Sequence, residues 1–230
     1  MKNNMSIENY FQKTKISFKK NGFAHLKNVL DKSNLLKILH ETIAIKNKKK
    51  VSNTKLLHIH KYSPLVKELF RNKFLKNLLI YILNYQDIMG LQSEIFYNPQ
   101  NTKGYGYHQD DFFLKTGRNN SANLWIPLVN TDKKNGTLYF LNNSHMMGID
   151  KKMNLMNLSS NKDNINLTKN YKKIRCDCKI GDAILISNYV FHKSGANLSK
   201  KSRNVLALGY IKPNSKYNAG STAKRKPFII

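Results

Sequence analysis

The sequence predicts a single mainly-β domain, a sandwich or barrel that is supported by helices from its N-terminal part. Before Asn84 the apolar residues recur at helical spacing, whereas after it short apolar or alternating stretches follow one another between turn residues. Helices first and many short strands afterwards are typical of such an architecture. A chain of 230 residues, 40% of them hydrophobic, is long enough to bury one core.

The N-terminal part, residues 1–84, is expected to form a helical buttress that also contains the first strand. Asp31 or Ser33 offers the N-cap of its first helix. Pro64 begins a later helical region, at a first-turn position where its missing N–H costs nothing. The expected elements are a strand at 23–29, a helix at 35–45, and one or two helices between 63 and 83.

The remaining part, residues 85–230, is expected to form the β core. Turn residues such as Asn98-Pro99 and Asn135-Gly136 separate its expected strands. The segment 148–170 is polar and rich in Asn and Lys, which predicts a long surface loop or a lid over a site. The expected strands are 89–97, 105–113, 123–129, 137–141, 174–178, 183–187 and 205–211.

The chain is strongly basic, since 40 Lys and Arg residues against 13 Asp and Glu residues give a formal charge of +27. Such a surface attracts nucleic acid, an anionic membrane or an anionic small substrate. However, Lys and Asn are spread over the whole chain, and no nucleic-acid-binding motif concentrates the charge. We therefore interpret the charge as compositional, with an anionic small substrate as the next hypothesis and nucleic acid as a weaker one.

A cytoplasmic protein without a membrane span is expected. The N-terminus has no apolar signal region, and no stretch approaches the 18 or so apolar residues that a spanning helix needs. Cys176 and Cys178, two positions apart, are too close for an unstrained disulfide if they lie on a strand. We expect them to be reduced thiols.

The most informative pattern is His108-x-Asp110, followed far downstream by His192. On a strand, side chains at i and i+2 share a face, so His108 and Asp110 could hold one ion together with His192. Two imidazoles and one carboxylate form the facial triad typical of Fe(II) that activates O₂, with positions left for a bidentate co-substrate. Arg203, eleven residues after His192, has the planar guanidinium that suits the distal carboxylate of such a co-substrate.

Taken together, these segments resemble the phytanoyl-CoA dioxygenase family of Fe(II)/2-oxoglutarate oxygenases. The similarity extends over nearly the whole chain, and it implies a double-stranded β-helix, also called a jelly roll or cupin-like barrel. The chain departs from the family where Asn142-Asn143 replace the usual Pro-Gly before Ser144-His145, and its short length argues against a large acyl-CoA substrate. The similar stretches, in order, are NGFAHLKNVLDKSNLLKI, YHQDD, NGTLYFLNNSH and IGDAILISNYVFHKSGANLSKKSR.

The resemblance also implies roles for individual residues. His108, Asp110 and His192 match the iron ligands, and Arg203 matches the residue that pairs with the far carboxylate of 2-oxoglutarate. The matching positions for further co-substrate contacts are Ser194 and Gln92, with Tyr105 and Tyr107 either lining the pocket or packing as ordinary aromatic residues. The remaining candidates are not expected to bind the metal: His145 is expected to be structural, the pair His58 and His60 to lie in the core or to line the pocket, and Asp111 to be a solvated or turn-capping acid.

The function expected from these residues is hydroxylation of a small molecule with Fe(II), 2-oxoglutarate and O₂, releasing succinate and CO₂. Related halogenases have a small residue where Asp110 stands, so halogenation is not expected. Two alternatives stay open: a cupin-like metal-binding or sensor domain without turnover, and a nucleic-acid oxidative demethylase. Against the demethylase alternative, the sequence lacks the second arginine that such enzymes place shortly after the first arginine. The sequence leaves the substrate and the choice between monomer and homodimer undetermined.

Overall fold

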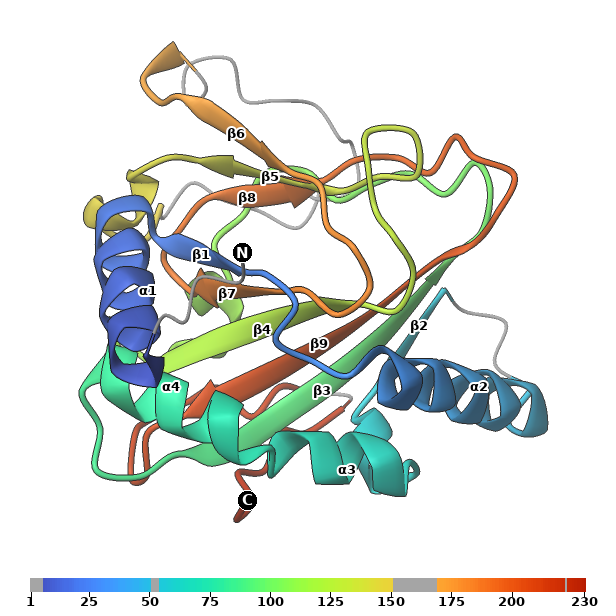
Figure 1. Ribbon diagram of the computed structural model, residues 1–230, viewed down its shortest axis with the longest axis horizontal. Helices are drawn as coiled ribbons and strands as arrows, with labels where there is room; N and C mark the ends of the chain where they lie inside the picture. Colours follow the sequence, from blue (N-terminus) through green and yellow to red (C-terminus); the bar gives the residue numbers. More distant parts are fainter. Residues whose placement is uncertain (1–5, 51–53, 151–168, 222) are drawn as a thin grey trace.

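A computed structural model describes residues 6–50, 54–150, 169–221 and 223–230. Two antiparallel sheets face each other, and helices cover the outer side of the larger sheet (Figure 1). The six-stranded sheet has the order β1 (Phe23–Leu26), β7 (Ala183–Ser187), β4 (Ser121–Pro127), β9 (Arg203–Ile211), β3 (Met89–Asn98) and β2 (Lys55–Leu57). The three-stranded sheet has the order β6 (Lys173–Cys176), β5 (Leu138–Leu141) and β8 (His192–Ser194).

The helices supply most of the outer layer. Four of them lie in the N-terminal part of the chain, and one short helix follows β3. They are α1 (Ile7–Asn21), α2 (Lys32–Lys48), α3 (Pro64–Phe70), α4 (Lys73–Leu83) and α5 (Asp111–Leu114), with 3₁₀ turns η1 (Ile59–Lys61) and η2 (Ser144–Met146). Among the described residues, no helix combines the length and the apolar character that crossing a membrane requires.

The central strands of the large sheet are buried on both faces, and the period of two residues assigns each side chain to one of two cores. In β9, Leu206 and Leu208 pack with the helices, whereas Val205 packs between the two sheets. In β7, Leu185 likewise faces the helices and Ile186 the space between the sheets. Because both faces of β7 are buried, every residue of this strand is apolar or small. Its inner face lies toward the space between the two sheets.

This architecture confirms the jelly-roll fold that the sequence predicted, with strand boundaries mostly within two residues of those expected. Asp31, and not Ser33, caps α2 by accepting a hydrogen bond from the Asn34 N–H. The helical region from Pro64 consists of two helices, α3 and α4. Most of the expected loop or lid, residues 151–168, lies outside the described residues, so that prediction stays open.

The helix α1 was not among the predicted elements. It begins at the N-cap Ser6 and ends at Gly22, whose φ of 81° is the left-handed conformation that glycine adopts at little cost. Its buried residues Phe11, Thr14 and Phe18 follow helical spacing. Because one member of this stripe is polar and lysines surround the others, the stripe gives a weak amphipathic signal.

The strand predicted at 105–113 was wrong. Only His108 pairs with a strand, in an isolated bridge to His192, and the chain then turns into α5. Asp110 has helical backbone angles, φ −64° and ψ −32°, because it precedes the first turn of that helix. The side chain of Asp111 stabilises the following turn by accepting hydrogen bonds from the backbone N–H groups of Thr116 and Gly117. A short strand, β2, was also not predicted.

Candidate metal and co-substrate site

Three side chains that are distant in sequence converge between the two sheets. The Nε2 of His108 lies 3.5 Å from Oδ1 of Asp110, and the Nε2 of His192 lies 3.9 Å from the same oxygen. One ligand atom from each residue lies within 4.8 Å of the other two. His192 comes from β8, His108 from the segment bridged to it, and Asp110 from the turn before α5. These are the three residues that the sequence suggested as ligands, and they converge although the strand expected for His108 and Asp110 is absent.

Backbone hydrogen bonds orient both imidazoles. The Nδ1 of His108 donates to the Gly106 carbonyl at 2.9 Å, and the Nδ1 of His192 donates to the Val190 carbonyl at 3.1 Å, which leaves each Nε2 with a lone pair directed toward Asp110. Carbonyl bonds of this kind commonly hold metal-binding histidines in the required tautomer. The arrangement fits a divalent ion bound by two nitrogens and one carboxylate oxygen.

The protonation states of Asp110 and His192 suit a metal. For His108, burial lowers the pKa, but the hydrogen bond to Asp110 outweighs it and raises that pKa above its ordinary value. Burial raises the pKa of Asp110, but the two imidazoles and a hydrogen bond from Asn123 outweigh it and hold that pKa well below its ordinary value. Burial and the neighbouring His108 lower the pKa of His192 to about 4. A carboxylate and a neutral imidazole are therefore present at neutral pH, as metal coordination requires.

A cavity of about 310 Å³ opens beside these residues, and Arg203 lies at its wall. The Arg203 side chain is buried, and burial lowers its pKa to about 10, so it remains a cation at neutral pH. Its Nη1 donates to the Gly136 carbonyl, but its Nε has no hydrogen-bond partner among the described residues. A buried guanidinium with an unused donor fits a carboxylate ligand.

The other predicted co-substrate residues also lie at this cavity. Ser194, Gln92 and Tyr105 all line it. The Ser194 hydroxyl accepts a hydrogen bond from the Tyr105 N–H at 3.0 Å, so its own hydrogen can be donated to a ligand. Tyr107, in contrast, packs with Leu141 and Phe191, which supports the aromatic-packing interpretation for that residue.

The sequence analysis missed four polar residues of the cavity: Asn123, Arg225, Lys55 and Glu94. Asn123 donates to Oδ2 of Asp110 at 2.6 Å and thereby positions the carboxylate. A polar residue on the inner face of the apolar strand β4 was a signal that could have identified it. Lys55 and Glu94 belong to β2 and β3, and Arg225 belongs to an irregular C-terminal segment without any pattern that predicts its position.

The three other histidines considered as candidates have structural partners. His145 Nε2 bonds to the Lys19 carbonyl of α1 at 2.9 Å. His58 and His60 are both buried; His58 bonds to the Ala223 carbonyl and His60 to the Ser93 hydroxyl. These contacts agree with the structural roles expected for all three. Asp111 is buried and caps a turn, so only the solvated alternative was wrong.

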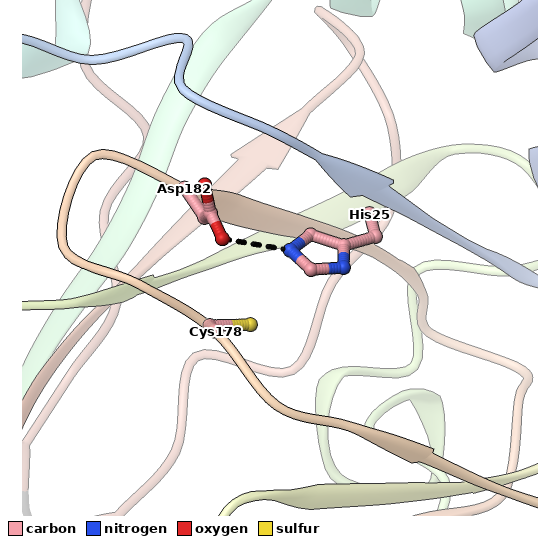
Figure 2. Close-up of side chains that lie close together, drawn as sticks. All are labelled: His25, Cys178 and Asp182. Atoms are coloured by element: carbon pink, nitrogen blue, oxygen red, sulfur yellow. Dashed lines mark hydrogen bonds and ion pairs between the residues drawn. The ribbon is translucent and has the colours of Figure 1, made fainter. Parts of the chain in front are cut away.

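A second group of candidate ligands, His25, Cys178 and Asp182, lies at the turn before β7 (Figure 2). Asp182 accepts hydrogen bonds from His25 Nε2 at 3.0 Å and from the backbone N–H groups of Asn28 and Lys179, both at 2.9 Å. Burial, with nearby carboxylates, raises the pKa of the Cys178 thiol, which keeps it protonated. Because Asp182 already has these partners and the thiol is neutral, we assign the group to turn stabilisation. Both cysteines are free thiols, as predicted.

The family model for phytanoyl-CoA dioxygenase (PhyH) matches residues 18–205 of this chain. The chain belongs to this family. Phytanoyl-CoA dioxygenase 1 of Oryza sativa subsp. japonica is 28% identical over 170 residues, which cover 73% of this chain and 60% of the rice protein. The chain thus spans about three fifths of the length of that relative.

Solved structures share the same fold. The non-haem α-ketoglutarate-dependent carbocyclase SnoK from nogalamycin biosynthesis matches with a TM-score of 0.79 at 14% identity, covering 95% of this chain and 90% of SnoK. EctD from S. alaskensis, solved with 2-oxoglutarate and 5-hydroxyectoine, matches with a TM-score of 0.74 at 16% identity, covering 95% of this chain and 80% of EctD. At these identities the likeness establishes the fold of this PhyH-family chain and not its substrate.

Proposed function

We propose that this protein is an Fe(II)- and 2-oxoglutarate-dependent dioxygenase that hydroxylates a small molecule. The observation that carries the proposal is the convergence of two imidazoles and one carboxylate within 4.8 Å, at a cavity that also contains a buried arginine. Family membership supports the reaction class. The bound 2-oxoglutarate of EctD supports the assignment of the co-substrate.

In this proposal His108, Asp110 and His192 would hold the iron through two imidazole nitrogens and one carboxylate oxygen. Bound iron would supply the oxidative chemistry, in which O₂ and 2-oxoglutarate give succinate, CO₂ and an oxygen atom for the substrate. Arg203 holds the distal carboxylate of 2-oxoglutarate. Ser194 and Gln92 offer further polar contacts to the co-substrate. The apolar walls of the cavity, which include Trp125 and other inward-facing residues, limit the access of water.

Asp110 decides between two reaction types in this proposal. Its carboxylate occupies a coordination position that a halide would need, and Asn123 holds it there by a hydrogen bond of 2.6 Å. We therefore infer hydroxylation and not halogenation.

The test is oxygen consumption and succinate release from the purified protein with Fe(II) and 2-oxoglutarate. We expect Asp110→Ala to abolish both, because two imidazoles alone hold the ion weakly. The matched control is Glu68→Ala, which removes a carboxylate that is 77% exposed on α3, and it should leave both rates unchanged. Metal binding without any succinate release by the wild type would favour the sensor alternative, and full turnover by Asp110→Ala would refute the ligand assignment.

A further inference from the structure

A C-terminal arm, residues 218–221 and 223–230, packs against the open side of β3 and η1. Gly90 and Phe228 exchange backbone hydrogen bonds of 3.0 and 2.8 Å, and the Phe228 ring stacks on His60 at 4.4 Å. His58 Nε2 donates to the Ala223 carbonyl at 3.0 Å. The two histidines of the LLHIH segment therefore anchor the arm on both sides of Arg225.

Between these anchors, Arg225 enters the wall of the cavity. Its Nε donates to Oε1 of Gln92, and its Nη1 donates to the Asn218 carbonyl at 3.1 Å. Both partners are neutral, and among the described residues no carboxylate lies within ion-pair distance of the guanidinium and no partner binds its Nη2. Arg225 is thus a positioned cation at the cavity without a counter-ion in direct contact.

The charges around the cavity do not balance. Lys55, Arg203 and Arg225 are cations, and Glu94 and Asp110 are carboxylates. Glu94 lies 3.8 Å from Lys55 and partly neutralises it. Fe(II) and 2-oxoglutarate carry equal and opposite charges, so binding both leaves one positive charge unmatched. A buried or half-buried site with one excess cation favours a ligand that carries one negative charge.

The two arginines act at different places along β9. Arg203 is its first residue, while Gln92, which holds Arg225, pairs with Gly209, six residues later. At about 3.3 Å per residue these points on the strand are roughly 20 Å apart. Gly209 also pairs with Asn123 of β4, whose side chain donates to Oδ2 of Asp110. Arg225 therefore lies on the metal side, where a substrate must present its reacting carbon.

We propose that Arg225 binds an anionic group of the substrate, a carboxylate or a phosphate, and that the substrate is a small acid. The proposal rests on the proposed function, because it assigns Arg203 to 2-oxoglutarate. It gives the C-terminal arm a role in substrate specificity, and it makes His58, His60 and Gly90 positioning residues for that role.

The experiment measures dissociation constants by calorimetry on protein loaded with Mn(II), which is expected to occupy the iron site without turnover, in the presence and absence of 2-oxoglutarate. The probes are matched acid and neutral pairs: hexanoate and hexanamide, benzoate and benzamide, and hexyl phosphate and hexanol. The proteins are the wild type, Arg225→Gln, Arg225→Lys and the control Arg175→Gln. The Arg175 side chain is 47% exposed and pairs with Asp177, the residue after β6.

We expect at least one acid to bind the wild type about tenfold more tightly than its neutral partner, as a charge-assisted hydrogen bond provides. Arg225→Gln should remove that preference, Arg225→Lys should retain part of it, and Arg175→Gln should retain all of it. The affinity for 2-oxoglutarate should be the same in all four proteins, which also shows that the variants are folded. The relative preference for hexanoate or hexyl phosphate distinguishes a carboxylate from a phosphate substrate.

Three results would overturn the proposal: no acid preference in the wild type, a preference that survives Arg225→Gln, or a loss of 2-oxoglutarate affinity in Arg225→Gln. If Arg225→Gln does not fold, Arg225→Lys decides: a reduced acid preference supports the proposal, and an acid preference equal to that of the wild type overturns it. Failure of the oxygenase assignment has a different signature, namely a wild type that binds the acids through Arg225 but neither binds nor consumes 2-oxoglutarate.

Discussion

Asn123 shows how a residue that does not touch the metal can control it. Its Nδ2 donates to Oδ2 of Asp110 at 2.6 Å and to Oδ1 of Asn188 at 3.0 Å, so the carboxylate is held in one orientation. The absence of a side chain at Gly209 allows this, because a Cβ there would lie 2.9 Å from Asn123 Oδ1. The site is thus organised by a residue pair across β4 and β9 as much as by the ligands.

We predict that Asn123→Ala weakens the binding of Fe(II) or Mn(II) by about 10- to 100-fold, the usual effect of removing a partner that orients a ligand. Titration of the metal against the purified variant measures this. The control is Asn77→Ala on an exposed position of α4, which should bind metal like the wild type. Equal affinities in the two variants would show that Asp110 needs no support from Asn123.

At this scale the sequence pointed to the three candidate metal ligands and to Arg203, which the structure brings to one cavity, because their chemistry is distinctive. It did not predict Asn123 or Arg225. An asparagine has no distinctive chemistry in a chain where about one residue in seven is Asn. Arg225 depends on an irregular segment whose path follows from tertiary contacts, and no local periodicity encodes such a path.

Among the elements, the turn before β7 depends on the charge of Asp182. Burial raises the pKa of this group, but the hydrogen bonds from Lys179, Asn28 and His25 outweigh it and lower the pKa below its ordinary value of 3.8. A carboxyl group with a lowered pKa in the folded state contributes stability above the pKa of the unfolded state. That contribution is lost as the pH falls below about 4 and through the folded-state pKa.

We therefore predict that Asp182→Asn lowers the free energy of unfolding at pH 7 by about 1–3 kcal/mol, since it weakens hydrogen bonds to a charged acceptor. The difference from the wild type should shrink between pH 4 and pH 2. Urea unfolding at pH 7, 4 and 3 measures both effects. A difference that stays constant over this range would mean that the charge of Asp182 is not what stabilises the turn.

The contact between β3 and the C-terminal arm depends on the missing side chain of Gly90. A Cβ at this position would lie 2.3 Å from the Phe228 ring. We predict that Gly90→Ala destabilises the fold by about 1–3 kcal/mol through overpacking and speeds amide exchange at Phe228. Hydrogen exchange and urea unfolding test this. Gly148→Ala, where a Cβ meets nothing within 4 Å, is the control and should change neither.

The elements that the sequence predicted best were the ones buried on both sides or strongly periodic, such as α4, β7 and β9. The predicted strand at 105–113 failed because the backbone already has helical angles at Asp110 and enters α5 at Asp111, whose side chain stabilises the turn after that helix. Burial still alternates from Tyr107 to Phe112 although the backbone turns, so alternation alone does not identify a strand.

For the whole molecule, the charge of +27 is the property that the fold explains least. If this charge only reflects the amino-acid composition and serves no binding function, binding to DNA should be weak, independent of the DNA sequence and strongly reduced by salt. We predict that fluorescence anisotropy with labelled duplex and single-stranded DNA shows a loss of affinity of at least tenfold between 50 and 200 mM salt, as several phosphate contacts give. Salt-resistant or sequence-dependent binding would instead favour the demethylase alternative.

The C-terminal arm follows, along the chain, every residue that we assign to iron and to 2-oxoglutarate, and it lies beyond residue 205, where the family match ends. Recognition and oxidation would then be encoded in separable stretches of the gene. Under natural selection, mutations in the roughly dozen codons of the C-terminal arm could change substrate selectivity without altering the residues of the reaction centre. The same separation makes the arm a natural target for combinatorial libraries in directed evolution.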